Sequence, residues 1–402
     1  MSFDILTPNG TLNDTNNQEV SSRLSASIKV VGVGSGGVNA VNSMIDAQVS
    51  NVEFYAINTD NAMLMTSKCE NKIQIGKDGF GVGGDPKKGK QCANESIEDL
   101  KDMLSGADMV FITTGMGGGT GTGAAPVIAE LAKGMGILTV GVVTRPFTAE
   151  GQVRIDNAEK GIKEIKQFTD ALIVIPNDNA YKYIDEKTPL DTAFGIIDQV
   201  LRRAIESITD TITKTGKHIN IDFADVKKVL TDSEYVVIGL SDGKDCKEAL
   251  ERALENVLVE GPNIKDAENV LINISCSVNN PLTLADRKLL DDIIRKDFAN
   301  CKFSKVGDIV SNSLDTRIKV SIIASSTKKA TIQTELFEED TITETPKETP
   351  KRAKRFEDLE EDIIKPTKIK LDSIKNITDD FDNDIFSKPA YEFWTIKWLK
   401  KD

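Results

Sequence analysis

The sequence predicts an α/β fold for the first half of the chain, with a mostly parallel sheet covered by helices. A long helix and a second domain of α+β type are expected to follow. Three observations lead to this prediction. Short apolar runs alternate with stretches of helical spacing. Two of the junctions between them are rich in glycine. One apolar stripe of helical period then extends from Pro189 to Thr215, the longest periodic segment of the chain.

Composition narrows the class of protein. The chain has 402 residues, enough for two domains with sizeable cores and a tail. Its formal net charge of -13 argues against sequence-independent binding to nucleic acid. The five cysteines form no C-x-x-C pair, and His218 is the single histidine, which excludes a multi-histidine zinc site in one chain. Residues 1–25 do not resemble a signal peptide, and no stretch approaches transmembrane length. We therefore expect a cytoplasmic protein with no nucleic-acid partner.

The first glycine-rich junction follows the first predicted strand. Residues 1–27 are rich in Asn, Thr and Ser and are predicted to be a disordered extension. A strand is expected from Ile28, and a helix from about Val38. Between them the glycines at 32, 34 and 37 spell G-x-G-x-x-G, and Asp60 follows a second strand at 52–57. This pattern is almost the full dinucleotide-binding fingerprint, and alone it would predict a Rossmann-type NAD(P)-dependent oxidoreductase.

The second junction is richer still in glycine. It reads T-T-G-M-G-G-G-T-G-T-G over 113–123, between a buried-type strand at 108–112 and a helix from about Ala124, with Pro126 expected in the first turn. A flexible linker does not usually lie between a buried strand and a helix. A loop poor in side chains before a helix N-terminus is instead typical of an anion site, where backbone N–H groups converge. A third run, G-x-x-x-x-G-K at 84–90, has Gln91 where a P-loop needs Ser or Thr, so we expect no phosphate site there.

The remaining elements follow from the same patterns. The first domain is expected to continue with a strand at 137–143, a helix at 150–168 and a strand at 171–175. In the second domain we predict strands at 235–240, 270–277, 303–309 and 317–323 and helices at 246–258 and 283–298. The predicted boundaries are 28–189 for the first domain, 190–215 for the central helix, 216–325 for the second domain, 326–378 for a disordered linker and 379–402 for a docking peptide.

Two further segments carry polar or aromatic signals. Asp222 and Asp225 precede a short apolar helix, and spacing alone favours the ordinary reading, in which Asp222 is the N-cap and Asp225 is at N3. The linker is dense in charges of both signs. Beyond it lie both tryptophans, Trp394 and Trp398, and large apolar residues after a disordered linker suggest a peptide that docks on a partner.

The run G-G-G-T-G-T-G, with the preceding A-D-M-V-F-I-T-T-G-M, resembles the FtsZ family of bacterial cell-division GTPases in the tubulin superfamily. The resemblance covers roughly residues 28–325 and implies the tubulin/FtsZ fold, with a Rossmann-like domain that binds GTP or GDP. It also implies head-to-tail self-assembly into filaments of a septal ring at the division site beneath the membrane. The tail would bind membrane-tethering division proteins.

The resemblance also assigns roles to individual residues. Phosphates would be held by two backbone cradles, formed by Ser35, Gly36, Gly37, Val38, Asn39, Gly118, Gly119, Thr120 and Gly121. Glu150 and Arg154 would lie on the sugar side. Phe194, Asn177 and Asp198 would contact guanine, where a ring can stack and a carboxylate can accept from N1 and N2. From spacing alone, Glu150 and Arg154 are an ordinary i,i+4 helix pair and Phe194 an ordinary core residue.

The motif Asn220-x-Asp222-x-x-Asp225 matches the family loop that reaches the γ-phosphate of the neighbouring subunit. There the carboxylates would polarise the attacking water, while Mg²⁺, held through phosphates and water, offsets phosphate charge. The chain departs from the family pattern at Ser35, where glycine is usual, and at 216–219, which is a residue longer. Two alternatives stay open: the oxidoreductase, which has no standard place for the second glycine loop, and a nucleotide-binding scaffold without turnover, which the presence of Asp222 and Asp225 disfavours.

Overall fold

The structure is a computed structural model that describes residues 26–182, 188–214, 216–231, 233, 235–255, 261, 263–310 and 317–326. The chain divides into two units, Met1–Thr331 and Ile332–Asp402, and every described residue belongs to the first. The docking peptide predicted at 379–402 lies outside the described residues. So do the predicted linker after Ser326 and the N-terminal extension as far as residue 25.

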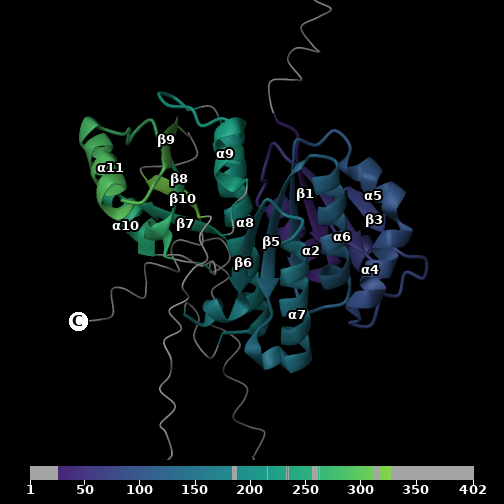
Figure 1. Cartoon of the computed structure of the whole chain (residues 1–402). Coiled ribbons are helices and arrows are strands. Elements are labelled where there is room, and N and C mark those ends of the chain that lie inside the picture. The colour runs from purple at the N-terminus through teal and green to yellow at the C-terminus, as the bar shows by residue number, and fades with distance from the viewer. Residues whose placement is uncertain are drawn as a thin grey trace, which may run out of the picture. The chain divides into compact units, whose positions relative to one another are not determined.

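The first domain is built on a six-stranded parallel sheet with the order β3-β2-β1-β4-β5-β6 (Figure 1). Its central strands are buried on both faces, as a parallel sheet requires: Val30 belongs to one core, and Val31 and Val33 to the other. The strands are β1 (Ile28–Val33), β2 (Glu53–Asn58), β3 (Asn71–Gln74), β4 (Met109–Gly115), β5 (Leu138–Arg145) and β6 (Ala171–Pro176). The predicted α/β class is confirmed.

Helices cover both faces of this sheet. One face packs against α2 (Gly34–Asp46) and α8 (Leu190–Thr213), and the other against α5 (Ile97–Leu104), α6 (Thr120–Gly134) and α7 (Gln152–Ile165). The remaining elements of the domain are α3 (Asn61–Thr66), α4 (Pro86–Glu95) and the 3-10 turns η1 (Thr148–Glu150) and η2 (Asn177–Lys182).

The G-x-x-x-x-G-K run proves to be part of a helix–helix contact. Gly89 lies inside α4, where a Cβ atom would come 2.4 Å from the Gly119 carbonyl oxygen. A Cβ atom at Gly123 of α6 would come 2.0 Å from the carbonyl oxygen of Pro86. The two glycines therefore let the backbones of α4 and α6 touch, and this run forms no phosphate loop of its own.

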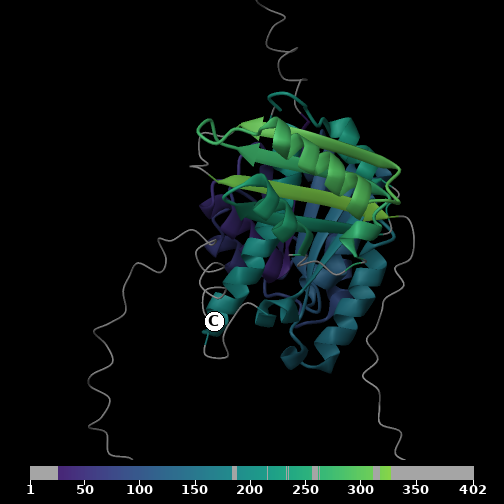
Figure 2. The ribbon, with the colours of Figure 1, turned by 90° about the vertical axis from the view of Figure 1, so that its left-hand side faces the viewer.

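The second domain has a four-stranded mixed sheet with the order β7-β10-β8-β9, seen in front in Figure 2. β10 is antiparallel to β7 and β8, whereas β9 is parallel to β8. The elements are α9 (Phe223–Leu230), β7 (Tyr235–Gly243), α10 (Cys246–Glu255), η3 (Ile264–Asp266), β8 (Asn269–Cys276), α11 (Leu284–Asp297), β9 (Phe303–Val310) and β10 (Ile318–Ser326).

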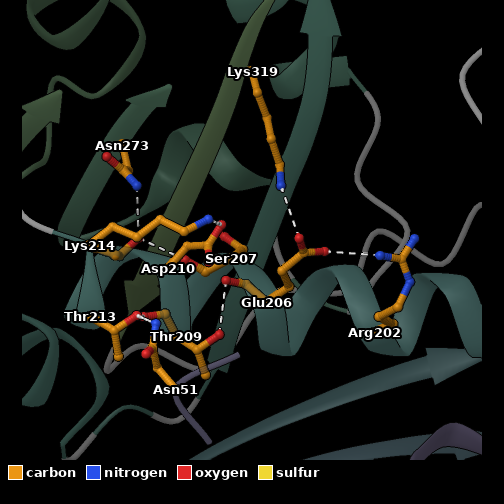
Figure 3. Close-up of polar contacts among 11 residues, drawn as sticks. Asn51, Arg202, Glu206, Ser207, Thr209, Asp210, Thr213, Lys214, Asn273 and Lys319 are labelled. Atoms are coloured by element: carbon orange, nitrogen blue, oxygen red, sulfur yellow. Dashed lines mark hydrogen bonds and ion pairs between the residues drawn. The ribbon is translucent and has the colours of Figure 1, made fainter. Parts of the chain in front are cut away.

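The 24-residue helix α8 lies between the two sheets and contacts α2, β5 and β7 (Figure 1). The apolar core that contains Leu201 and Ile205 of α8 continues from β1 into the second sheet. Polar contacts add to it: Asn273 of β8 donates to Thr211 Oγ1 at 3.2 Å, and Lys319 of β10 lies 3.7 Å from Glu206 (Figure 3). The helix therefore joins the two domains into one folded body.

Three short elements do not appear in the sequence prediction: α3, β3 and α5. β3 is an edge strand of four residues, Asn-Lys-Ile-Gln, and none of its residues is fully buried. Such a strand lacks the apolar run by which the inner strands were recognised.

Candidate functional site

β1 and β4 are hydrogen-bonded neighbours in the middle of the sheet. From β1 the chain adds β2 and β3 toward one edge, and from β4 it adds β5 and β6 toward the other. In open α/β sheets, ligands bind at such a switch point, outside the carboxyl ends of the strands. Both glycine-rich junctions lie there, because α2 follows β1 and α6 follows β4. The structure thus brings the two predicted cradles together: a Cβ atom at Gly34 would lie 2.9 Å from the amide nitrogen of Gly121.

The first cradle is the first turn of α2. The helix begins at Gly34, not near Val38 as expected, because Gly34 takes a φ of 70° and turns the chain directly into the helix. Ser35 has no positive φ, so the serine that replaces the usual glycine is unstrained. Gly37 packs directly on β4, since a Cβ atom there would lie 2.3 Å from the Thr113 carbonyl oxygen. Ser35, Gly36 and Asn39 are exposed, and Gly37 and Val38 are buried.

The second cradle is the first turn of α6, which begins at Thr120 and not at Ala124. Pro126 consequently lies inside the helix and not in its first turn. A Cβ atom at Gly121 would lie 2.0 Å from Thr114 Oγ1, and that hydroxyl donates to the Val33 carbonyl at 2.8 Å. Gly118, by contrast, faces open space.

Neither helix has a side-chain N-cap. Their first backbone amides therefore have no capping partner among the described residues, and both helix dipoles point their positive ends at the same place. Two adjacent, uncapped helix N-termini are the arrangement typical of an anion site built from backbone amides. The Thr120 side chain is already engaged, because its hydroxyl lies 2.7 Å from that of Thr59.

Asp60 lies at the start of α3. Its carboxylate caps α3 by accepting from the amides of Ala62 at 2.9 Å and Met63 at 3.4 Å. The acidic residue of the dinucleotide fingerprint thus has a structural explanation, which removes one of the two observations that favoured an oxidoreductase.

The predicted sugar-side pair lies on η1 and α7. Glu150 accepts from the Phe147 amide at 2.9 Å and pairs with Arg154, whose side chain is half exposed. Next to them, the backbone amide of Thr148 donates to Asp178, at the start of η2, at 3.1 Å. These contacts hold η1 against η2 and leave the Arg154 guanidinium accessible to an anionic ligand.

The predicted base-contacting residues lie on η2 and on the first half of α8, two elements in contact. The Phe194 ring is 39% exposed and meets Phe147 edge-on, with centroids 5.4 Å apart. Asn177 is buried, yet its Oδ1 has no hydrogen-bond partner. Burial raises the pKa of Asp198 to about 7, and no described residue pairs with this carboxylate. An unpaired amide oxygen and an unpaired carboxylate are acceptors that a ligand with N–H donors would satisfy.

Asn220, Asp222 and Asp225 lie elsewhere, after the far end of α8. Asp222 is the N-cap of α9 and accepts from the Asp225 amide at 2.9 Å, while Asp225 accepts from the Asp222 amide at 3.0 Å. Asn220 is exposed and accepts from the Gly216 amide at 2.8 Å. The capping role expected from spacing alone is therefore present. At 1.5 Å per residue, Phe194 and the end of α8 at Thr213 are roughly 30 Å apart along the helix.

Comparison with known proteins identifies the class of site. The model of the Tubulin/FtsZ family GTPase domain matches residues 27–185. A structure of an FtsZ dimer from M. jannaschii is 36% identical, with a TM-score of 0.70, and the match covers 79% of this chain and 93% of that one. The chain belongs to the tubulin/FtsZ family. A second FtsZ structure from the same organism, a single-site variant, is 38% identical, also with a TM-score of 0.70, and covers 77% of this chain and 93% of that one.

A more distant relative shows the fold alone. CetZ2 from Haloferax volcanii, solved as a protofilament with GTPγS, is 18% identical with a TM-score of 0.63, and the match covers 76% of this chain and 94% of that one. The expected tubulin/FtsZ fold is thus confirmed, and the GTPase domain occupies the half of the chain that carries both cradles. Family membership does not favour the oxidoreductase.

The sequence prediction missed several residues that shape this tubulin/FtsZ site. Lys305 of β9 pairs with Asp225, Asp308 of β9 accepts from the Ile219 amide just before Asn220, and Asp178 holds η1. Lys305 is separated from Asp225 by 80 positions, so no local pattern connects them. The side chain of His218 is 69% exposed, and its Nδ1 lies 2.6 Å from Asp308 Oδ2.

Within the described part of the chain, no three His, Cys, Asp or Glu side chains are grouped as a metal site. In the same residues, none of the helices is both long and apolar enough to cross a bilayer.

Proposed function

We propose that this chain is a GTPase that polymerises head to tail, and that GTP bound by one subunit is hydrolysed with the help of aspartates from the next. The observation that carries the proposal is the separation of the two half-sites. The cradles and the base-contacting residues lie near the start of α8, whereas Asp222 and Asp225 follow its end. A rigid helix keeps them apart in one chain, so a complete site needs two.

The binding half follows from the donors and acceptors present. The amides of Ser35 to Gly37 and of Gly118 to Gly121 would hold the phosphates, with Arg154 adding positive charge at the rim. Asn177 Oδ1 and the Asp198 carboxylate would accept from the N–H groups of guanine, and Phe194 would stack on the base. As the family resemblance implies, Mg²⁺ would be held through phosphate oxygens and water.

The reaction half follows from the free oxygens of the aspartates. Asp222 is anchored through Oδ1, so its exposed Oδ2 is free to orient a water molecule at the neighbour's γ-phosphate. Attack forms a bond from the water oxygen to the γ-phosphorus and breaks the bond to the β–γ bridging oxygen, while a carboxylate accepts the water proton.

Relatives support self-association. One similar FtsZ was solved as a dimer, and CetZ2 as a protofilament. By the same resemblance we propose that the filament acts in the cytoplasm at the division site, as part of a septal ring, with the segment 379–402 bound to membrane-tethering division proteins.

The test is phosphate release at increasing protein concentration. We expect activity per chain to rise above a threshold concentration, because dilution separates the half-sites. Activity strictly proportional to concentration, down to the most dilute sample, would contradict a shared site. Asp225→Ala is expected to keep GTP binding and to lose most hydrolysis. Added to the unsubstituted protein, it is expected to lower activity more than dilution does. If the Asp225→Ala monomer lost GTP binding, Asp225 would belong to the GTP-binding half-site and not to the half-site that acts on the neighbour's nucleotide.

A further inference from the structure

The edge strand β9 fixes the longer loop at 216–221. The Lys217 amide donates to the Asp308 carbonyl at 2.9 Å, and the Asp308 amide donates to the Ile219 carbonyl at 3.2 Å. The Asp308 carboxylate accepts from the amides of His218 at 3.1 Å and Ile219 at 2.8 Å. Gly307 lets Ile221 approach, since a Cβ atom there would lie 2.7 Å from its Cγ1. The loop therefore follows β9 and does not swing freely.

A second residue of β9 reaches the aspartates themselves. Lys305 Nζ donates to Oδ2 of Asp225, and the two side chains are 29% and 17% exposed. The same Oδ2 accepts from the Asp222 amide at 3.0 Å. Among the described residues, no backbone amide and no lysine donates to Oδ1 of Asp225. One oxygen of this carboxylate is thus held by two donors, while the other is left available.

We infer that Lys305 is a positioning residue of the intersubunit site, which holds Asp225 ionised with Oδ1 free to accept a proton from the attacking water. The inference rests on the proposed function. The ordinary alternative is a surface ion pair of little consequence. Two features disfavour that alternative: the pair is partly buried, and the oxygen that Lys305 engages also accepts from the Asp222 amide of the capping box.

The charges around Asp225 agree with this role. Burial alone would raise the pKa of Asp225, but the hydrogen bond from Lys305, the hydrogen bonds with Asp222 and the charge of Lys305 together lower it. Among the other elements packed against α9, β8 has no Asp, Glu, Lys, Arg or His, Lys319 of β10 lies 3.7 Å from Glu206, and Lys214, which follows α8, is paired with Asp210 at 2.7 Å. On α9 itself, Lys228 lies over the Phe303 ring.

The test compares Lys305→Met with Lys305→Arg and with Lys228→Met. Lys228→Met removes the same charge from the same region without touching Asp225. We expect Lys305→Met to lower kcat for GTP hydrolysis roughly tenfold and to move the acid limb of the kcat–pH profile up by about one pH unit, because Asp225 is then easier to protonate. Lys305→Arg is expected to restore most of kcat, and Lys228→Met to leave both quantities unchanged.

GTP binding by the monomer and sedimentation of filaments with a slowly hydrolysed GTP analogue serve as controls, and both are expected to be unchanged in Lys305→Met. If this variant folds poorly, Lys305→Gln replaces it. An unshifted acid limb with unchanged kcat, or an equal loss in Lys228→Met, would reduce Lys305 to a surface ion pair. Either result leaves the proposed function standing. That function is tested separately, and it fails if the unsubstituted protein shows no rise in specific activity with concentration.

Discussion

Asp198 and Asp308 are both partly buried carboxylates, and their surroundings shift their pKa values in opposite directions. Burial raises the pKa of Asp198 to about 7, since no described residue compensates its charge. Burial would raise that of Asp308 too, but hydrogen bonds from the Ile219 amide and from the ring and amide of His218 lower it overall. A carboxylate left uncompensated marks a place where a ligand supplies the missing donors.

Asp198 therefore predicts a pH-dependent affinity for GTP. The free protein is protonated at Asp198 below about pH 7, whereas guanine N–H donors need the ionised form, so binding releases a proton. We expect affinity to fall as pH drops from 8 to 6, measured by calorimetry in buffers of different ionisation enthalpy. The ligand-free protein is also expected to lose stability as pH rises from about 4 to about 7, because the unfolded chain ionises first.

Asp198→Asn provides the control for that prediction. The amide cannot ionise, so the pH dependence is expected to disappear, and GTP is expected to bind roughly ten- to hundredfold more weakly because an acceptor is lost. Xanthosine triphosphate carries an oxygen where guanine has its amino group, and the new amide can donate to it. A variant that keeps full GTP affinity and the original pH dependence would remove Asp198 from the base site.

At the scale of elements, the inner strands and the long helix were predictable because apolar periodicity reports burial directly. The starts of α2 and α6 were not. Glycine is a poor helix former, so the sequence predicts loops at Gly34 to Gly37 and at Thr120 to Gly123. Close packing decides otherwise, because only glycine fits between α2 and β4 at Gly37. The contacts of β9 with the loop before α9 could not be predicted from the sequence. Asp308 and His218 are 90 positions apart, so no local pattern connects them.

Substitution by alanine is expected to have opposite effects at Gly37 and at Gly118. In Gly37→Ala the new Cβ atom would lie 2.3 Å from a backbone oxygen of β4, so α2 must shift. We expect a loss of about 1–3 kcal/mol in unfolding free energy, with GTP binding impaired. Gly118→Ala has no atom within 4 Å of its Cβ and is expected to keep the stability of the parent. Urea unfolding with and without GDP measures both. Equal stabilities for the two variants would contradict the observed packing.

At the scale of the whole molecule, the described residues form one body that contains neither of the two tryptophans. This offers a test of the tail, whose proposed docking segment carries Trp394 and Trp398. We expect emission typical of solvated indole, with a blue shift when a membrane-tethering division protein binds. Truncation after Thr378 is expected to leave GTP turnover and polymerisation unchanged. If the truncated protein lost GTP turnover, the tail would be part of the active enzyme. If the emission did not shift, the proposal that this segment binds a division protein would be contradicted.

The length of α8 has an arithmetic consequence for a filament whose sites are shared between neighbours. In the proposed filament every subunit would carry one nucleotide, but the subunit at one end would have no following loop to complete its site. Such an assembly would therefore hold one nucleotide more than it could cleave. A pair of subunits would release one phosphate for two bound GTP molecules, and a long filament nearly one for each. The end that exposes α2 and α6 would keep its GTP however old the rest of the filament becomes, and so would remain chemically distinct from the interior.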